Sequence, residues 1–131
     1  MNYFQESGPV KGEILMKTYI MYGKTSSEYA AGMVSKPHNR IEVVQPLVDQ
    51  FNMKIREFLF TNGESFNWLG VCEAEDDSTM EAVVGIILSS GNWANMHWSR
   101  AYDSLEYKAI YDKAHEGMAS YVTTMQVAGG S

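Results

Sequence analysis

Four segments of the chain have the pattern of β-strands, in which aromatic and β-branched residues alternate with polar ones or form short apolar runs. They cover residues 16–23, 53–61, 66–74 and 93–102. The third segment, FNWLGVCEA, is the most apolar of them. Between the second and third segments, Asn62-Gly63 is a dipeptide typical of tight hairpin turns. The pattern therefore predicts four strands, with a tight turn between the middle two.

The segments between and after these strands have apolar residues at helical spacing. The predicted helices are a short one over 27–33, one from about 37 to 51, one from about 78 to 90, and a last one from about 103. Hydroxyl side chains at 25–27 can cap the first helix. We expect Pro37 at the first helical position of the second, and Pro46 to kink or break it near 42–45, because proline lacks an N–H and its ring clashes with the preceding turn.

Capping residues indicate where the later helices begin and end. Asp77 or Ser78 can cap the third helix, and Ser78 opens a segment with capping-box spacing. Gly91 fits the position just beyond its C-terminus. Asp103 and Glu106 have the same capping-box spacing at the start of the last helix. That helix carries an apolar row on one side, made of Tyr107, Ile110, Tyr111, Ala114 and Met118.

The order strand, helix, strand, strand, helix, strand is that of the ferredoxin-like fold. Its two right-handed crossovers place both helices on one face of a four-stranded antiparallel sheet with strand order 4-1-3-2. The predicted class is therefore α+β, a ferredoxin-like βαββαβ domain with a C-terminal helix. We expect a polar leader or arm over 1–15, the domain with its last helix over 16–120, and a tail over 121–131.

Both faces of the predicted sheet are apolar. In the third strand Phe66, Trp68 and Cys72 point to one side, and Leu69 and Val71 point to the other. A sheet that is apolar on both faces is normally covered on both, and two helices cover only one. We therefore expect a second copy of the chain on the other face, in a homodimer packed sheet to sheet or in a larger ring.

Composition narrows the classes of partner. Sixteen acidic residues against ten basic ones give a net charge of −6, which argues against a nucleic-acid or anionic-membrane surface. No apolar stretch approaches the length of a membrane span. Cys72 is the only cysteine, so no intrachain disulfide is possible, and we interpret it as a small buried apolar residue. We expect a cytoplasmic protein without nucleic-acid partners or membrane insertion.

The segment KIREFLFTNGESFNWLGVCEAEDD, followed by GNWANMHWSRAY, resembles the GYD-domain family of the dimeric α+β barrel superfamily. Thr61-Asn62-Gly63 and Gly91-Asn92 match the family pattern, while Phe66-Asn67 stands where the family has Tyr-Asp. The resemblance covers roughly residues 17–106. It implies a ferredoxin-like fold and a dimer or larger ring. It implies little about activity, because the superfamily includes monooxygenases, isomerases, haem enzymes and ligand-binding domains.

Two titratable residues are candidates for catalysis. His97 has an ordinary pKa near neutrality and would suit a general base; the alternative is a histidine of the core or the interface. The pKa of Glu73 would rise if this residue were buried in the same cavity; the alternative is a carboxylate in water at a strand end. Two strand spacings, roughly 10 Å, separate them, so the two side chains would share a ligand without touching.

Six side chains of the strands and their turn are candidates for an aromatic pocket that binds a planar or apolar molecule. They are Tyr19, Tyr22, Phe66, Asn67, Trp68 and Trp98. The alternative is that these side chains form the core and the sheet-to-sheet interface. No pair of histidines has metal-ligand spacing and no phosphate-binding loop is present, so we expect neither a metal nor a cofactor.

The leading functional hypothesis is a small homo-oligomeric binding or accessory protein, with an aromatic-lined pocket between sheet and helices for a small apolar or aromatic molecule. A second hypothesis is a small cofactor-free enzyme, similar to the monooxygenases or isomerases of the superfamily, with His97 as its base. A third is a structural subunit of a larger complex.

Overall fold

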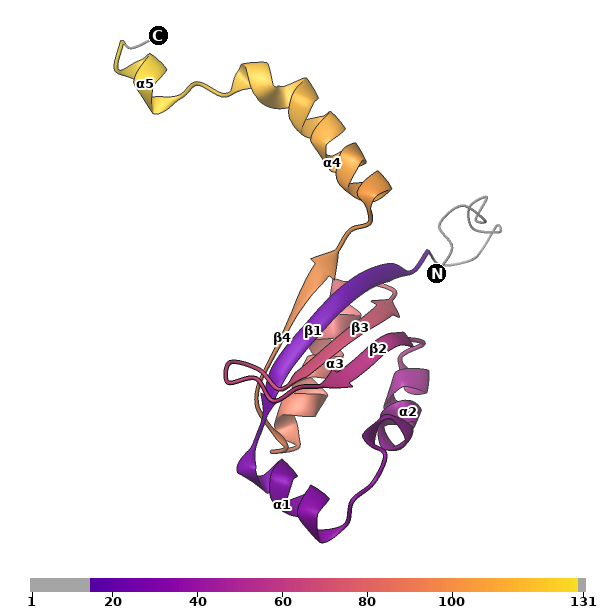
Figure 1. Ribbon diagram of the computed structural model, residues 1–131. Coiled ribbons are helices and arrows are strands. Elements are labelled where there is room, and N and C mark those ends of the chain that lie inside the picture. The colour runs from indigo at the N-terminus through magenta and orange to yellow at the C-terminus, as the bar shows by residue number, and fades with distance from the viewer. Residues whose placement is uncertain (1–14, 130–131) are drawn as a thin grey trace. The chain divides into compact units, whose positions relative to one another are not determined.

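The computed structural model describes residues 15–129 (Figure 1). The expected leader, apart from its last residue, and the final two residues of the expected tail lie outside this range. By their contacts the residues form two units, the first ending at Ala101 and the second beginning at Tyr102. Each unit is described by itself below.

The first unit contains one antiparallel sheet of four strands. Their bounds are β1 Lys17–Thr25, β2 Lys54–Phe60, β3 Trp68–Ala74 and β4 Trp93–Ala101. The spatial order is β2-β3-β1-β4, so the two central strands are the first and third in sequence. This is the predicted order, and the ferredoxin-like α+β class is confirmed.

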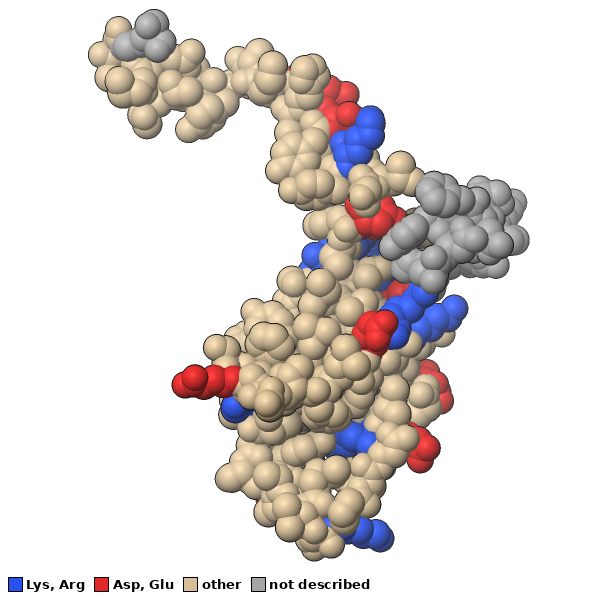
Figure 2. Space-filling model, in the orientation of Figure 1, with Lys and Arg blue, Asp and Glu red and all other residues tan. Residues whose placement is uncertain are grey.

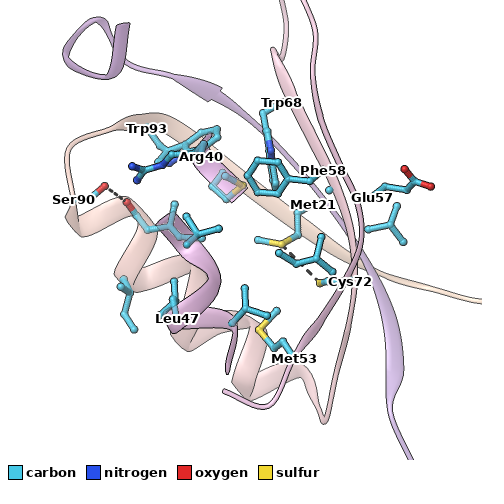
Figure 3. A pocket seen from close by; sticks show the side chains of 18 residues that line it. Met21, Arg40, Leu47, Met53, Glu57, Phe58, Trp68, Cys72, Ser90 and Trp93 are labelled. Carbon is cyan, nitrogen blue, oxygen red and sulfur yellow. Dashed lines mark hydrogen bonds between the residues drawn. The ribbon is translucent and has the colours of Figure 1, made fainter. Parts of the chain in front are cut away.

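Helices α1 Ser27–Ser35 and α2 Arg40–Gln50 follow the first strand, and α3 Asp77–Ser89 connects β3 to β4. Helices α2 and α3 pack against the same face of the sheet (Figures 1 and 3). Tyr19 and Met21 of β1 and Trp68 and Cys72 of β3 face them and are buried, whereas Phe60 on the edge strand is 48% exposed. The core comprises Tyr19, Met21, Trp68, Cys72, Ala74 and Met96 from the strands, Val48 and Met53 from α2 and its end, and Met80, Val83 and Val84 from α3.

The opposite face, which we call the open face, carries the alternate residues of the same strands. Ile20 of β1 pairs with Val71 of β3, and Tyr22 pairs with Leu69. Leu59 of β2 lies next to Leu69 and is 51% exposed. No described helix of the first unit packs on these residues, and the surface over the strands is mostly uncharged in Figure 2. Over the two central strands this face is therefore apolar, as predicted, whereas β4 contributes His97 and Ser99 to it.

The connection between β2 and β3 is longer than the tight turn predicted from Asn62-Gly63. It runs over 61–67, and Gly63 does not have the positive φ that such a turn requires. The Thr61 backbone N–H donates to the carbonyl of Asn67 across the loop. Lys24 Nζ donates to the carbonyls of Gly63 and Glu64, at 3.0 Å each. These contacts to β1 hold the loop open, and a dipeptide signal could not reveal them.

The expected position of Pro37 was wrong, and so was a break of the helix at Pro46. Pro37 lies in the loop before α2, which begins at Arg40 after the N-cap Asn39. Pro46 lies inside α2, and the helix continues through it to Gln50. Pro46 and Glu42, whose carbonyl loses its helical donor, are both exposed, so water can replace the missing hydrogen bond.

Asp76, rather than Asp77 or Ser78, caps α3. Its Oδ1 accepts from the backbone N–H of Thr79 at 2.9 Å and from the hydroxyls of Thr79 and Ser78. These hydrogen bonds, that of the Thr79 backbone first, lower the pKa of Asp76. Gly91 has a φ of 79° just beyond the end of α3, as predicted.

The second unit contains α4 Ser104–Gly117, a 3₁₀ turn Met118–Ser120 and α5 Thr124–Val127. The predicted capping box of Asp103 and Glu106 is present at the start of α4. The rings of Tyr107 and Tyr111 lie 5.0 Å apart on one side of this helix. None of the residues in these three helices is buried.

The close contact between Gly70 and the Trp68 ring allows a test of the core packing. A Cβ at Gly70 would lie 2.5 Å from Cη2 of Trp68, so we expect Gly70→Ala to lower the free energy of unfolding by about 1–3 kcal/mol. The control is Gly85→Ala in α3, where a Cβ meets no atom within 4 Å and alanine favours the helix by up to about 1 kcal/mol. Urea denaturation measures both. A Gly70→Ala protein as stable as the original would contradict this packing.

Candidate functional site

A mainly apolar cavity of about 180 Å³, partly open to the surface, lies between the sheet and helices α2 and α3 (Figure 3). The sheet supplies one wall, including Met21, Phe58, Trp68 and Cys72. Helix α2 supplies the opposite wall through its apolar stripe, and α3 closes one side with Ile86 and Ile87. The helical residues that line the cavity from α2 are Arg40, Val44, Leu47 and Val48.

The Trp68 indole is held in place by three neighbours. It lies directly over Gly70, where any Cβ would clash with its six-membered ring. Phe58 and Trp93 contact it edge to face, with ring centroids at 5.2 and 5.4 Å. Such aromatic pairs are favourable beyond their buried area. The ring orientation is therefore fixed by β2, β3 and the start of β4 together.

The Nε1–H group of Trp68 has no hydrogen-bond acceptor. The residue is 5% exposed, and its nitrogen is the only buried side-chain nitrogen or oxygen without a partner in the described part of the chain. An unpaired buried donor destabilises a fold by about 1–3 kcal/mol. With less than 1 Å² of accessible surface, this nitrogen is enclosed by the packing around the indole.

Three sulfur atoms meet beside the cavity. Cys72 Sγ lies 3.9 Å from the sulfur of Met21 and 3.9 Å from that of Met80. Burial raises the pKa of the Cys72 thiol to about 11, with a smaller contribution from the charge of Glu73. The thiol therefore stays protonated at neutral pH, as expected for a small buried apolar residue.

The charged and hydroxyl groups around the cavity are engaged elsewhere. The Arg40 guanidinium lies over the Tyr29 ring at 5.9 Å, and the Ser90 hydroxyl donates to the carbonyl of Ile87 at 2.6 Å. The Glu57 carboxylate points away from the cavity beyond the strands (Figure 3). The Arg40 guanidinium is thus the one basic group of the lining, and the lining residues other than Arg40, Glu57 and Ser90 carry no charged or hydroxyl group.

The structure separates the six residues of the predicted aromatic pocket. Tyr19, Trp68 and Trp98 lie on the helix-covered side of the sheet, and only Trp68 among the six lines the cavity. Tyr22 lies on the open face, where Phe66 contacts it edge to face at 5.8 Å. The site proposed from the sequence is therefore divided between the two faces.

The remaining members of the predicted pocket have structural partners. Asn67 accepts from the backbone N–H of Thr25 and donates to its hydroxyl, both at 2.9 Å, which ties the loop 61–67 to the end of β1. Trp98 Nε1 donates to Glu81 of α3 at 2.5 Å.

Tyr19 is fully buried in the centre of the sheet. Its hydroxyl donates to Asp77 Oδ1 at 2.7 Å and so connects β1 to the start of α3. Burial, reinforced by this hydrogen bond and by the charge of Asp77, raises the pKa of Tyr19 to about 12. The phenol is therefore neutral and structural at physiological pH.

The two candidate catalytic residues lie outside the cavity wall and far from each other. His97 is exposed on the open face, with its ring 5.2 Å from that of Tyr22. Glu73 forms an ion pair with Arg56 of the neighbouring strand. In the register, Glu73 is level with Ala101, four residues along β4 from His97, so the two lie roughly 16 Å apart rather than 10 Å.

Most of the cavity residues were not candidates in the sequence. Val44 and Leu47 belong to the apolar spacing that predicts the helix from about 37 to 51, and they form part of the cavity wall. Met53 and Ile55 carry no signal that distinguishes a cavity lining from a filled core. In residues 15–129 no group of three potential His, Cys, Asp or Glu ligands comes together, and no helix is long and apolar enough to cross a membrane.

The family model of the GYD domain matches residues 19–111, from β1 into α4. The chain belongs to the GYD-domain family. The resemblance seen in the sequence is thus confirmed, and the family is one of the dimeric α+β barrel fold. Comparison with curated proteins and with solved structures found no match.

The hydrogen bond between Tyr19 and Asp77 predicts a specific alkaline behaviour. Tyr19→Phe should lower the free energy of unfolding at neutral pH by about 1–2 kcal/mol. Because the folded pKa of about 12 lies above the ordinary value of 10, this contribution is complete below pH 10 and is lost as the pH rises to 12.

The measurement is chemical denaturation of both proteins between neutral pH and pH 12. The stability difference should shrink above pH 10, whereas Tyr121→Phe, at a residue 72% exposed, should show no difference at any pH. A Tyr19→Phe difference that stays constant up to pH 12 would contradict the assignment.

Proposed function

We propose that this GYD-domain protein is a small homo-oligomeric binding protein that takes up a small apolar or aromatic molecule in the cavity between its sheet and its helices. The observation that carries the proposal is the cavity itself, about 180 Å³ of space that is partly open to the surface in a unit of about a hundred residues. Protein interiors are normally close-packed, and an unfilled space forfeits dispersion contacts along its whole lining.

The size and lining of the cavity indicate the class of ligand. A dry cavity of about 150 Å³ lined by aliphatic and aromatic side chains is known to bind benzene. This cavity is slightly larger and is lined by similar residues, with thioethers of Met21, Met53 and Met96 among them. Methionine adapts readily to the shape of a ligand. A single ring with a small substituent fits this space.

Binding rather than catalysis is the function that these residues support. The cavity wall contains neither His97 nor Glu73, and its cysteine is protonated. The neutral thiol is a poor nucleophile, since the thiolate is the reactive form. We therefore assign the cavity the role of holding a molecule.

The open face supports the homo-oligomeric part of the proposal. Ile20 and Tyr22 on the central strand are 37% and 40% exposed, and Leu59 on the edge strand is 51% exposed. Contiguous apolar surface on a sheet usually marks an interface. A second copy presents the same surface, so two open faces bury each other in an isologous dimer.

Filling the cavity should abolish binding. We expect Val44→Phe to place a ring in the cavity, which reduces the affinity for toluene at least tenfold and leaves the fold intact. The matched control is Val43→Phe on the same helix, since Val43 is 53% exposed and does not line the cavity. It should bind toluene as the original protein does.

Methyl-labelled methionine reports the binding by NMR. The signals of Met21, Met53 and Met96 should shift with toluene, and those of Met118 and Met125 in the second unit should not. Absence of any toluene-dependent shift in the original protein, or equal binding by Val44→Phe, would count against the proposed site.

The proposed dimer gives a separate prediction. Ile20→Glu places a charge in the middle of the open face and should convert a dimer into a monomer at micromolar concentration. Val34→Glu on α1, at a residue 83% exposed outside that face, should remain dimeric. Sedimentation velocity distinguishes the two states. A monomeric original protein would refute the dimer and leave the binding proposal standing.

A further inference from the structure

The cavity has a charged end and an apolar end. Its lining residues on α2 recur at helical spacing along one side of that helix, and they are Arg40, Val44, Leu47 and Val48. Arg40 is the first residue of α2, about 12 Å along the helix axis from Val48. In Figure 3 Arg40 lies toward one end of the cavity and Leu47 toward the other. A molecule that fills the cavity thus has one end near a cation.

Aromatic rings position the Arg40 guanidinium at its end of the cavity. The Tyr29 ring centroid lies 5.9 Å from Cζ of Arg40. The same ring contacts Trp93, which also lines the cavity, at 5.9 Å between centroids. A cation over a ring is attracted by the negative ring face, and this contact consumes none of the five N–H donors of a guanidinium. The contact with Tyr29 therefore orients the group and leaves its donors available.

The chain itself makes little use of those donors. Arg40 Nη1 donates to Nε2 of the exposed His38 at 3.4 Å, which is long for a hydrogen bond. No carboxylate within residues 15–129 forms an ion pair with Arg40, whereas Arg56 is paired with Glu73. Arg40 is thus a cation in the wall of a mainly apolar cavity, and the described chain supplies no anion for it.

We propose that the molecule bound in this cavity is a small monocarboxylate, whose apolar ring or short chain lies toward Leu47 and Val48 and whose carboxylate accepts hydrogen bonds from the Arg40 guanidinium. This inference rests on the function proposed above and specifies the ligand class of the same site. The two groups match in shape, because two parallel N–H donors of a guanidinium meet the two oxygens of a carboxylate.

Partial exposure of Arg40 makes this end of the cavity suitable for a charged group. Arg40 is half-buried, so a carboxylate beside it keeps part of its water, and complete burial of an ion is what makes a charge so costly. The other charged residue of the lining is Glu57, and its carboxylate points beyond the strands (Figure 3). An ammonium group would be repelled by Arg40, so the lining favours an anion over a cation.

Two probes of nearly equal size test the pairing. Phenylacetate carries the carboxylate, and phenylacetamide has a neutral amide in its place. Toluene reports on the apolar part of the site alone. The methyl signals of Met21, Met53 and Met96 show by NMR whether the ring of each probe enters the cavity.

The Nε–H signal of Arg40 reports the ion pair directly. Phenylacetate should move this signal, whereas phenylacetamide and toluene should leave it nearly unchanged. The Nε–H signal of Arg56, which already donates to Glu73, is the internal control and should not respond to any of the three probes.

We expect phenylacetate to bind about tenfold more tightly than phenylacetamide, since hydrogen bonds to ionised groups are the stronger ones. Arg40→Met keeps an apolar stem and removes the charge, so this affinity ratio should fall to about one. Lys36→Met removes the same charge from an exposed residue outside the lining, and it should preserve the ratio. High salt should weaken the binding of phenylacetate and not that of phenylacetamide, because salt screens a partly exposed ion pair.

The pairing is refuted if phenylacetate and phenylacetamide bind the original protein equally, or if Arg40→Met leaves their ratio unchanged. Binding of toluene then shows that the apolar site remains. Phenylacetate that binds Val44→Phe as tightly as the original protein lies outside the cavity, which also refutes the inference. If toluene and both probes fail to bind, the proposed function fails together with this inference. The Arg40 signal and the salt dependence need only the original protein, so they decide even if Arg40→Met does not fold.

Discussion

The contact between the Trp68 indole and the bare backbone of Gly70 organises the helix-covered side of the sheet. Because Gly70 has no Cβ, the large ring lies flat over its own strand rather than standing up between the helices. Phe58 and Trp93 then pack against it from the neighbouring elements. The cavity lies between this aromatic layer and α2.

The two faces of the sheet have different roles because a strand sends successive side chains to opposite sides. One face is closed within a single chain by α2 and α3, and it contains the cavity. The other presents Ile20, Tyr22 and Leu59 to the surface. The proposed ligand and the proposed second copy therefore occupy opposite sides of the same four strands. Ligand binding and dimer formation can thus be tested independently of each other.

Much of the fold could be predicted from local sequence. The capping box of Asp103 and Glu106 and the turn at Gly91 depend on neighbours within a few residues, and both are present. Predictions that depended on distant partners were less secure. Asn62-Gly63 does not form a tight turn, and its loop accepts hydrogen bonds from Lys24 instead. Asp76 rather than Asp77 caps α3, and Asp77 accepts a hydrogen bond from the Tyr19 hydroxyl.

By itself, the sequence determined the order of strands and helices, the α+β class and the apolar character of both sheet faces, because hydrophobic spacing is a local property of the chain. Only the tertiary structure decided which residues meet. Pairing of β1 with β3 and β4 placed Tyr19 and Trp68 on one side and Tyr22 and His97 on the other. The irregular register of β2 adds a shift that no alternation pattern reveals. A cavity and an unpaired donor are products of such long-range packing, which is why neither could be found in the order of the residues.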